Sequence, residues 1–205
     1  MDECPDAVLI DDTLAVVSAG DVIDTSLLHQ RIHFITGEVN SETIRYAMIW
    51  LLYAETSLEI GRPLTFVINS CGGSLYDAFG LIDMMRVSKH KIRTVGVGNI
   101  MSCAALILMA GTRGLRIVSK NAGILSHQFS AGFEGKKHEL DAHMKELDFC
   151  EKRLCQIIQE CCSEHMDHEK IKTTLLPPTD VWLQPQDLVA LGMVDQLLTT
   201  LSWNP

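Results

Sequence analysis

Several features common in other protein classes are missing from this sequence. Basic residues are few: 17 lysines and arginines stand against 26 aspartates and glutamates in 205 residues, which gives a net charge of −9. A chain with that excess of negative charge repels nucleic acid and anionic membranes, so neither is expected as a partner. The longest near-apolar run, 100–110, has only about half of the roughly 20 residues that a membrane-spanning helix needs.

Signals for export and for disulfide bonds are also missing. The first residues, MDECPDAVLIDDT, lack the basic and apolar regions of a signal peptide, so we expect a cytoplasmic protein. The seven cysteines are an odd number without a CxxC pair, and we expect reduced thiols. A metal site formed by Cys161, Cys162, His165 and His168 is an alternative interpretation of the cysteine-rich stretch. The missing CxxC pair disfavours it, and we expect no metal and no organic cofactor.

Familiar nucleotide-binding and hydrolase motifs are absent as well. The stretches CGGS and GVGNIMS match neither the phosphate-binding loop GxxxxGK[ST] nor the dinucleotide fingerprint GxGxxG. The nucleophile motif GxSxG of α/β-hydrolases fails around Ser102, because Ile100 and Ala104 occupy the glycine positions. Any site must therefore be built from other residues.

What is present is an alternation of strand and helix patterns, which predicts βαβ units and a mainly parallel sheet in an α/β fold. The pattern of the first 20 residues predicts either short strands or a mobile hairpin. The predicted strands are 31–39, 64–70, 91–98, 114–120, 123–127 and 193–198, and the predicted helices are 41–57 with Ser41 as N-cap, 74–88, 102–109, 134–162 and 184–192.

The helix predicted over 134–162 differs from the others in length. At about 1.5 Å per residue it would extend beyond a compact α/β core. An apolar stripe on such an arm is typical of packing against another subunit, so we expect an oligomer. The stripe consists of Leu140, Met144, Leu147, Leu154, Ile158 and Cys161.

Two strand-to-helix junctions, INSCGGS and GVGNIMSCAA, are the candidate site. Parallel strands bring both junctions to the carboxyl edge of the sheet, where open α/β folds bind ligands. The paired glycines Gly72 and Gly73 let the backbone approach another group closely. Ser102 would lie at the start of a buried helix, a position suited to a nucleophile, with the N–H of Cys103 suited to an oxyanion. The alternative is that Ser102 only caps a core helix.

A serine nucleophile needs a base, and the base needs an orienting carboxylate. His127 directly follows an apolar strand and precedes a glycine-containing loop, whereas most other histidines lie among charged residues. Asp180 lies between a proline break and two bulky apolar residues, where a carboxylate can be partly buried. Asp167, Asp187 and Asp195 remain rivals for the acid.

The order of the motifs RIHFITGEV, FVINSCGGSLYDAFGLIDMM, VGVGNIMSCAALILMAGTRGLR, ILSHQFSAGFEG and LVALGMVDQLL resembles ClpP, the proteolytic subunit family of the Clp ATP-dependent serine proteases, from about residue 28 to 198. The resemblance implies a ClpP/crotonase-type α/β core of repeated ββα and βα units with a protruding handle helix. It implies one peptidase domain over 1–205, with an N-terminal segment at 1–27 and the handle at 129–165. Phe129 and Thr179, where the family usually has proline and arginine, indicate a divergent member of a phage or plasmid type.

Carried over to this chain, the resemblance makes Ser102 the nucleophile, His127 the general base and Asp180 the acid, with the N–H groups of Gly73 and Cys103 as the oxyanion hole. It implies two stacked seven-membered rings, a homo-oligomeric tetradecamer that hydrolyses peptides and unfolded proteins in a closed chamber, and a Clp-type AAA+ unfoldase as partner. The alternatives are a non-catalytic ring subunit and a crotonase-type acyl-CoA enzyme.

Overall fold

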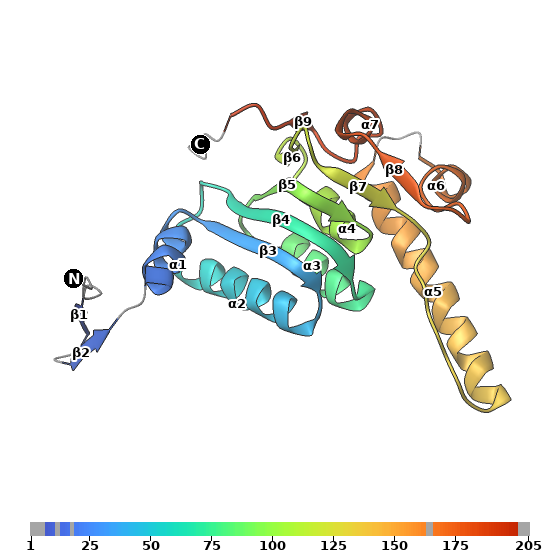
Figure 1. The fold of residues 1–205 in the computed structure, drawn as a ribbon, viewed down its shortest axis with the longest axis horizontal. Helices are drawn as coiled ribbons and strands as arrows, with labels where there is room; N and C mark the ends of the chain where they lie inside the picture. Colours follow the sequence, from blue (N-terminus) through green and yellow to red (C-terminus); the bar gives the residue numbers. More distant parts are fainter. Residues whose placement is uncertain (1–6, 11–12, 17–18, 163–165, 201–205) are drawn as a thin grey trace, which may run out of the picture.

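The structure is a computed structural model that describes residues 7–10, 13–16, 19–162 and 166–200. Its centre is a mostly parallel sheet that alternates with helices along the chain, so the expected α/β fold is confirmed (Figure 1). The sheet order is β3 (Ile32–Val39), β4 (Leu64–Gly73), β5 (Ile92–Met101), β6 (Arg116–Val118) and β9 (Gln196–Leu197). All of these neighbours pair in parallel.

The last residues of β5 leave β6 and take a different neighbour. Thr94–Gly96 pair with β6, whereas Asn99–Met101 pair with β7 (Gly123–Ser126). On its other edge β7 pairs with β8 (Val181–Leu183), and this is the antiparallel pair of the sheet. The long β5 therefore joins the central sheet to a small extension formed by β7 and β8.

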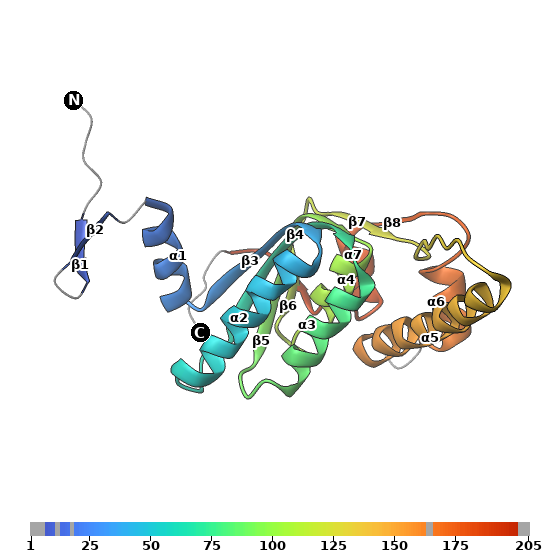
Figure 2. The same ribbon diagram turned by 90° about the horizontal axis from the view of Figure 1, so that it is seen from below.

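Three helices lie side by side against one face of the sheet: α2 (Ser41–Ser57), α3 (Leu75–Val87) and α4 (Cys103–Met109) (Figures 1 and 2). The first five residues of β4 are all buried, which is why that strand reads as a continuous apolar run. All seven residues of α4 are buried, so this helix is enclosed by its neighbours. The predicted N-cap of α2 was wrong by one residue: Asn40, not Ser41, accepts hydrogen bonds from the N–H groups of Glu42 and Thr43.

The long helix α5 (Lys137–Cys161) confirms the prediction of an extended amphipathic helix. Figure 1 shows that its first half projects away from the sheet, whereas its last turns lie against the body. The predicted apolar stripe divides accordingly. Leu154, Ile158 and Cys161 are buried, but Leu140 and Met144 are exposed.

The remaining elements include several that the sequence analysis did not anticipate. Strands β1 (Ala7–Ile10) and β2 (Thr13–Val16) form the hairpin expected near the start of the chain and stand apart from the sheet in both views. Helices α1 (Ala19–His29) and α6 (His168–Thr174) and strand β8 were not predicted. Helix α7 (Pro185–Ala190) begins with its proline, as expected. Within the described parts of the chain, no helix is long and apolar enough to cross a membrane.

Candidate active site

Ser102 lies on a sharp turn between β5 and α4 with an unusual backbone conformation. Its φ is 53° and its ψ is −129°, a region that non-glycine residues rarely adopt and that costs about 1–3 kcal/mol. Its side chain makes no capping hydrogen bond to the helix, which argues against the alternative that Ser102 only caps α4. A strained strand-to-helix turn is also how α/β-hydrolases present a nucleophilic serine, although the motif differs here.

Two neighbours hold this turn. The backbone N–H of Ser102 donates to the carbonyl oxygen of Leu125 at 2.8 Å, which ties the turn to β7. On the other side lies Gly72, where an added β-carbon would come within 2.7 Å of both the Cβ of Ser102 and the carbonyl oxygen of Met101. The end of β4 can approach the serine this closely only because residue 72 is a glycine.

Ser102 and His127 line the same cleft. The cleft has a volume of about 530 Å³ and lies between the end of β4 and the base of α5, where Gly73, Leu75 and Cys150 contribute to its walls. A smaller cavity of about 30 Å³ also borders Ser102 and His127 and is otherwise lined mainly by apolar side chains of α4, α5 and the 175–176 segment. The structure therefore brings the expected nucleophile and the expected base to one opening.

His127 follows directly after β7 and is held through the residues on either side of it. The hydroxyl of Ser126 donates to the carbonyl oxygen of Leu175 at 2.6 Å, and the side-chain amide of Gln128 donates to the carbonyl oxygen of Leu176 at 2.9 Å. The sequence analysis did not single out these two anchors. The available signal was a pair of polar residues flanking a histidine at the end of a strand.

Asp180 directly precedes β8, opposite the end of β7. Ser126 pairs with Val181 across the two antiparallel strands, and one further step in that register places His127 across from Asp180. Asp180 is exposed. This differs from the partly buried position that the neighbouring apolar residues suggested.

The three rival carboxylates are occupied elsewhere. Asp167 caps α6 by accepting from the N–H of Lys170 at 2.8 Å, and Asp187 accepts from the N–H of Gln184 at 2.7 Å at the start of α7. Asp195 forms a 2.7 Å ion pair with the buried guanidinium of Arg116. These contacts explain all three rivals as structural groups.

The strand order brings Ser102, His127 and Asp180 to neighbouring positions, but their side chains are not hydrogen-bonded to one another. Among the described residues, no hydrogen bond links Ser102 to His127 or His127 to Asp180, whereas the Ser126 and Gln128 anchors are formed. Hydrogen bonds of a catalytic site are often long or poorly aligned without substrate and shorten when it binds.

The expected oxyanion donors, Gly73 and Cys103, face the same region. Burial raises the pKa of the Cys103 thiol to about 11, although hydrogen bonds from the N–H groups of Gly73 and Cys103 act in the opposite direction. The Gly73 N–H is therefore close to the first residue of α4, whose own N–H has no partner within the helix. A thiol with that pKa stays protonated at neutral pH, so Cys103 does not compete as a nucleophile.

Known proteins with similar sequences identify the family of this chain. A family model described as Clp protease matches residues 18–201. The chain belongs to the Clp protease family. It is 33% identical over 176 residues to the ATP-dependent Clp protease proteolytic subunit 1 of Prochlorococcus marinus (strain MIT 9312), an alignment that covers 86% of this chain and 88% of that protein. It is 31% identical over 176 residues to the protein of the same name from Prochlorococcus marinus subsp. pastoris, with 86% and 87% covered.

Proposed function

We propose that this Clp protease family member is a serine endopeptidase that hydrolyses peptides and unfolded proteins. The observation that carries the proposal is the shared cleft of Ser102 and His127, with Ser102 on a strained turn. The register of β7 and β8 supports Asp180 as the third member. The whole chain would then act as one peptidase unit in the cytoplasm.

The residues would divide the reaction as follows. The hydroxyl oxygen of Ser102 attacks the peptide carbonyl while His127 takes the hydroxyl proton, and His127 then returns that proton to the leaving amine. Asp180 holds the imidazole in the productive tautomer. The N–H groups of Gly73 and Cys103 donate to the oxyanion that forms on the carbonyl oxygen. Water hydrolyses the acyl-enzyme by the same route, and the steps require no metal or organic cofactor.

The projecting half of α5 supports assembly into stacked rings. Leu140 and Met144, four residues apart and therefore on one face of the helix, expose apolar side chains there, and Phe133 does so in the segment that leads into the helix. An exposed patch of that kind is unusual on a monomer and typical of a subunit interface. We propose that these residues contact a second seven-membered ring, that the full assembly is a homo-oligomeric tetradecamer, and that a Clp-type AAA+ unfoldase supplies it with unfolded chains.

Labelling with a serine-reactive fluorophosphonate, followed by mapping of the modified peptide, tests the proposal. We expect the label on Ser102, its loss in Ser102→Ala, and loss of peptide hydrolysis in that variant by a factor approaching about 10⁶. Ser57→Ala is the control, since it removes an exposed hydroxyl at the end of α2, outside the cleft. Unchanged hydrolysis in Ser102→Ala would refute the proposal.

A non-catalytic ring subunit is the second candidate, and the missing hydrogen bonds between Ser102, His127 and Asp180 favour it. A subunit of that kind would assemble into rings but take up no label. An acyl-CoA enzyme of the crotonase type would turn over acyl-CoA without needing Ser102. The labelling experiment, a peptide assay and an acyl-CoA turnover assay on the assembled protein together separate the three functions.

A further inference from the structure

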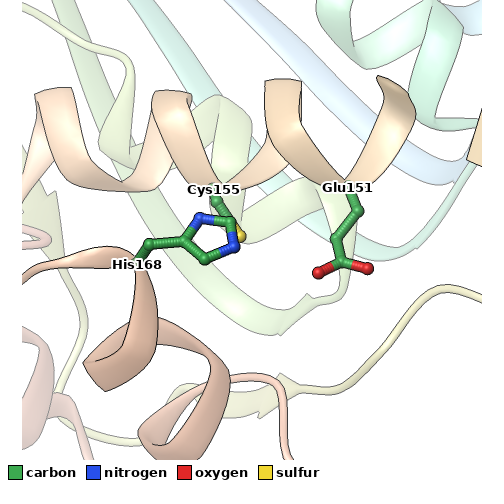
Figure 3. Close-up of side chains that lie close together, drawn as sticks. All are labelled: Glu151, Cys155 and His168. Carbon is green, nitrogen blue, oxygen red and sulfur yellow. The ribbon is translucent and has the colours of Figure 1, made fainter. Parts of the chain in front are cut away.

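Outside the cleft, three side chains with metal-binding atoms converge between α5 and α6. Glu151 and Cys155 lie four residues apart on α5 and therefore on one face of that helix, and His168 is the first residue of α6. One ligand atom from each of the three lies within 4.8 Å of the other two. Figure 3 shows the Glu151 and Cys155 side chains leaving the same side of α5, with the His168 ring beside the Cys155 sulfur.

The donor set is suited to zinc. Thiolate, imidazole and carboxylate are the three ligand types that bind Zn²⁺, whereas Mg²⁺ and Ca²⁺ prefer oxygen alone. With metal–ligand bonds of about 2.0–2.3 Å, the ligand atoms of a tetrahedral site lie about 3.3–3.6 Å apart. To reach that spacing from distances of at most 4.8 Å, the three ligand atoms would have to approach one another by about an ångström at most. Because Cys155 is buried while Glu151 is half-buried and His168 exposed, the two mobile side chains can close on the fixed thiol.

A cation already interacts with this cluster. The ammonium group of Lys172 forms an ion pair with the Glu151 carboxylate. Lys172 lies four residues after His168 on the same face of α6, so the two α6 residues oppose the two α5 residues. The Lys172 side chain is 43% exposed, and it can swing into solvent when another cation takes its place.

We propose that Glu151, Cys155 and His168 form a Zn²⁺ site in which Lys172 is displaced and water takes the fourth position. On the Glu151 side the cluster borders a cavity of about 520 Å³ beside α5, lined by Glu151 and Lys172 among others, from which water can reach the site. On binding, Cys155 gives up its thiol proton to solvent and Lys172 remains an ammonium ion.

The site would fasten α6 to the base of the projecting helix. The chain leaves α6 directly into Leu175 and Leu176, whose carbonyl oxygens accept the hydrogen bonds from Ser126 and Gln128. Zinc would therefore brace the segment that anchors both neighbours of His127. This inference does not depend on the proposed peptidase function, since the binding and its effect on stability are measured without substrate.

The test uses the full-length protein after removal of metal with a chelator. We expect it to take one equivalent of Zn²⁺ from a chromogenic competitor, to gain thermal stability, and with Co²⁺ to show thiolate-to-metal charge-transfer absorption in the near ultraviolet. Cys155→Ser should abolish that absorption. Glu151→Gln and His168→Asn, which change side chains outside the core, should each weaken Zn²⁺ binding by at least about 10- to 100-fold, the loss seen even for outer partners of metal ligands.

Matched variants separate this site from the other thiols and imidazoles. Cys150→Ala and His138→Gln, both on α5 but outside the cluster, should keep the wild-type affinity, and Lys172→Gln should raise it because a competing cation is removed. Circular dichroism of each variant without metal checks that it is folded. The proposal is overturned if the protein takes up no zinc, or if Glu151→Gln and His168→Asn bind it as tightly as the wild type.

Discussion

Gly72 and Ser102 are so close that a β-carbon on the glycine would lie 2.7 Å from the Cβ of the serine. Real side chains essentially never approach to that distance, so any larger residue at position 72 must displace the serine turn. The contact joins the ends of β4 and β5, which are neighbours in the sheet. The orientation of the candidate nucleophile thus depends on a backbone position that takes no part in the chemistry.

Gly72→Ala should therefore remove most peptidase activity. Gly114→Ala is the matched control: its φ of +88° is almost the same as the +87° of Gly72, but no atom lies within 4 Å of its added β-carbon. Both variants carry the backbone strain of a positive φ, about 1 kcal/mol or more. Only the first pushes on Ser102. Equal activities of the two variants, measured by peptide hydrolysis at equal thermal stability, would contradict the prediction.

Asp180→Asn should lower the turnover number by about 10⁴, the penalty for losing the carboxylate that sets the histidine tautomer in a serine protease triad. The rivals serve as controls. Asp167→Asn changes the N-cap of α6, where Asn is almost as good as Asp, and Asp187→Asn changes the third helical residue in the capping box of α7, so both should stay near wild-type activity. Steady-state kinetics on the assembled protein measure the difference. A greater loss in Asp187→Asn than in Asp180→Asn would show that the acid has been misassigned.

The third prediction concerns stability at mildly acidic pH. His33 packs against the rings of Trp50 and Phe66, and burial lowers its pKa to about 4, against the opposing attraction of Asp24. In the unfolded chain the imidazole has its ordinary pKa of about 6.5. Between those two values the unfolded state binds a proton that the folded state does not, so the free energy of unfolding falls as the pH falls.

By pH 5 that effect amounts to at most about 2 kcal/mol. Urea unfolding at pH 7 and pH 5 measures it. In His33→Gln, which cannot titrate, the difference between the two pH values should shrink by that amount. His138→Gln is the control, because it makes the same substitution at an imidazole that is exposed on α5. If the free energy of unfolding of His33→Gln changed between the two pH values as much as that of the wild type, the assignment of this effect to His33 would be refuted.

Those parts of the fold that depend on local pattern could be predicted from the sequence. The apolar run of β4 and the long periodic pattern of α5 both appear where expected. The approach of Ser102 and His127 to one opening could also be predicted from the sequence, because parallel strands end at one edge of the sheet. These are cases in which residues near one another in sequence, or strand direction alone, decide the outcome.

Other features depend on contacts that no local pattern reveals. The three residues of β8 are too few to show the alternating pattern of a strand, and they become a strand only by pairing with β7. The stripe on α5 is continuous in sequence, yet only its last part is buried, since only that part reaches the core. Likewise, Cys155 and His168 approach each other only because α6 folds back onto α5.

The last prediction concerns the exposed half of α5. Met144 is 58% exposed and Leu140 is 37% exposed on the part of the helix that projects from the body, whereas Leu154 is only 4% exposed. If that half packs against a second ring, Met144→Glu and Leu140→Glu place a charge in the interface without disturbing the core. Leu154→Glu would instead unfold the chain, because it buries an unpaired charge.

We therefore expect Met144→Glu to form assemblies smaller than those of the wild type, measured by size-exclusion chromatography with light scattering, and to lose peptidase activity while keeping its circular dichroism spectrum. Since a closed symmetric assembly repeats one contact many times, a single substitution weakens every copy. Val87→Glu is the control, as it makes the same change at an apolar residue that is 84% exposed at the end of α3. An unchanged mass for Met144→Glu would show that the projecting helix is not the contact between rings.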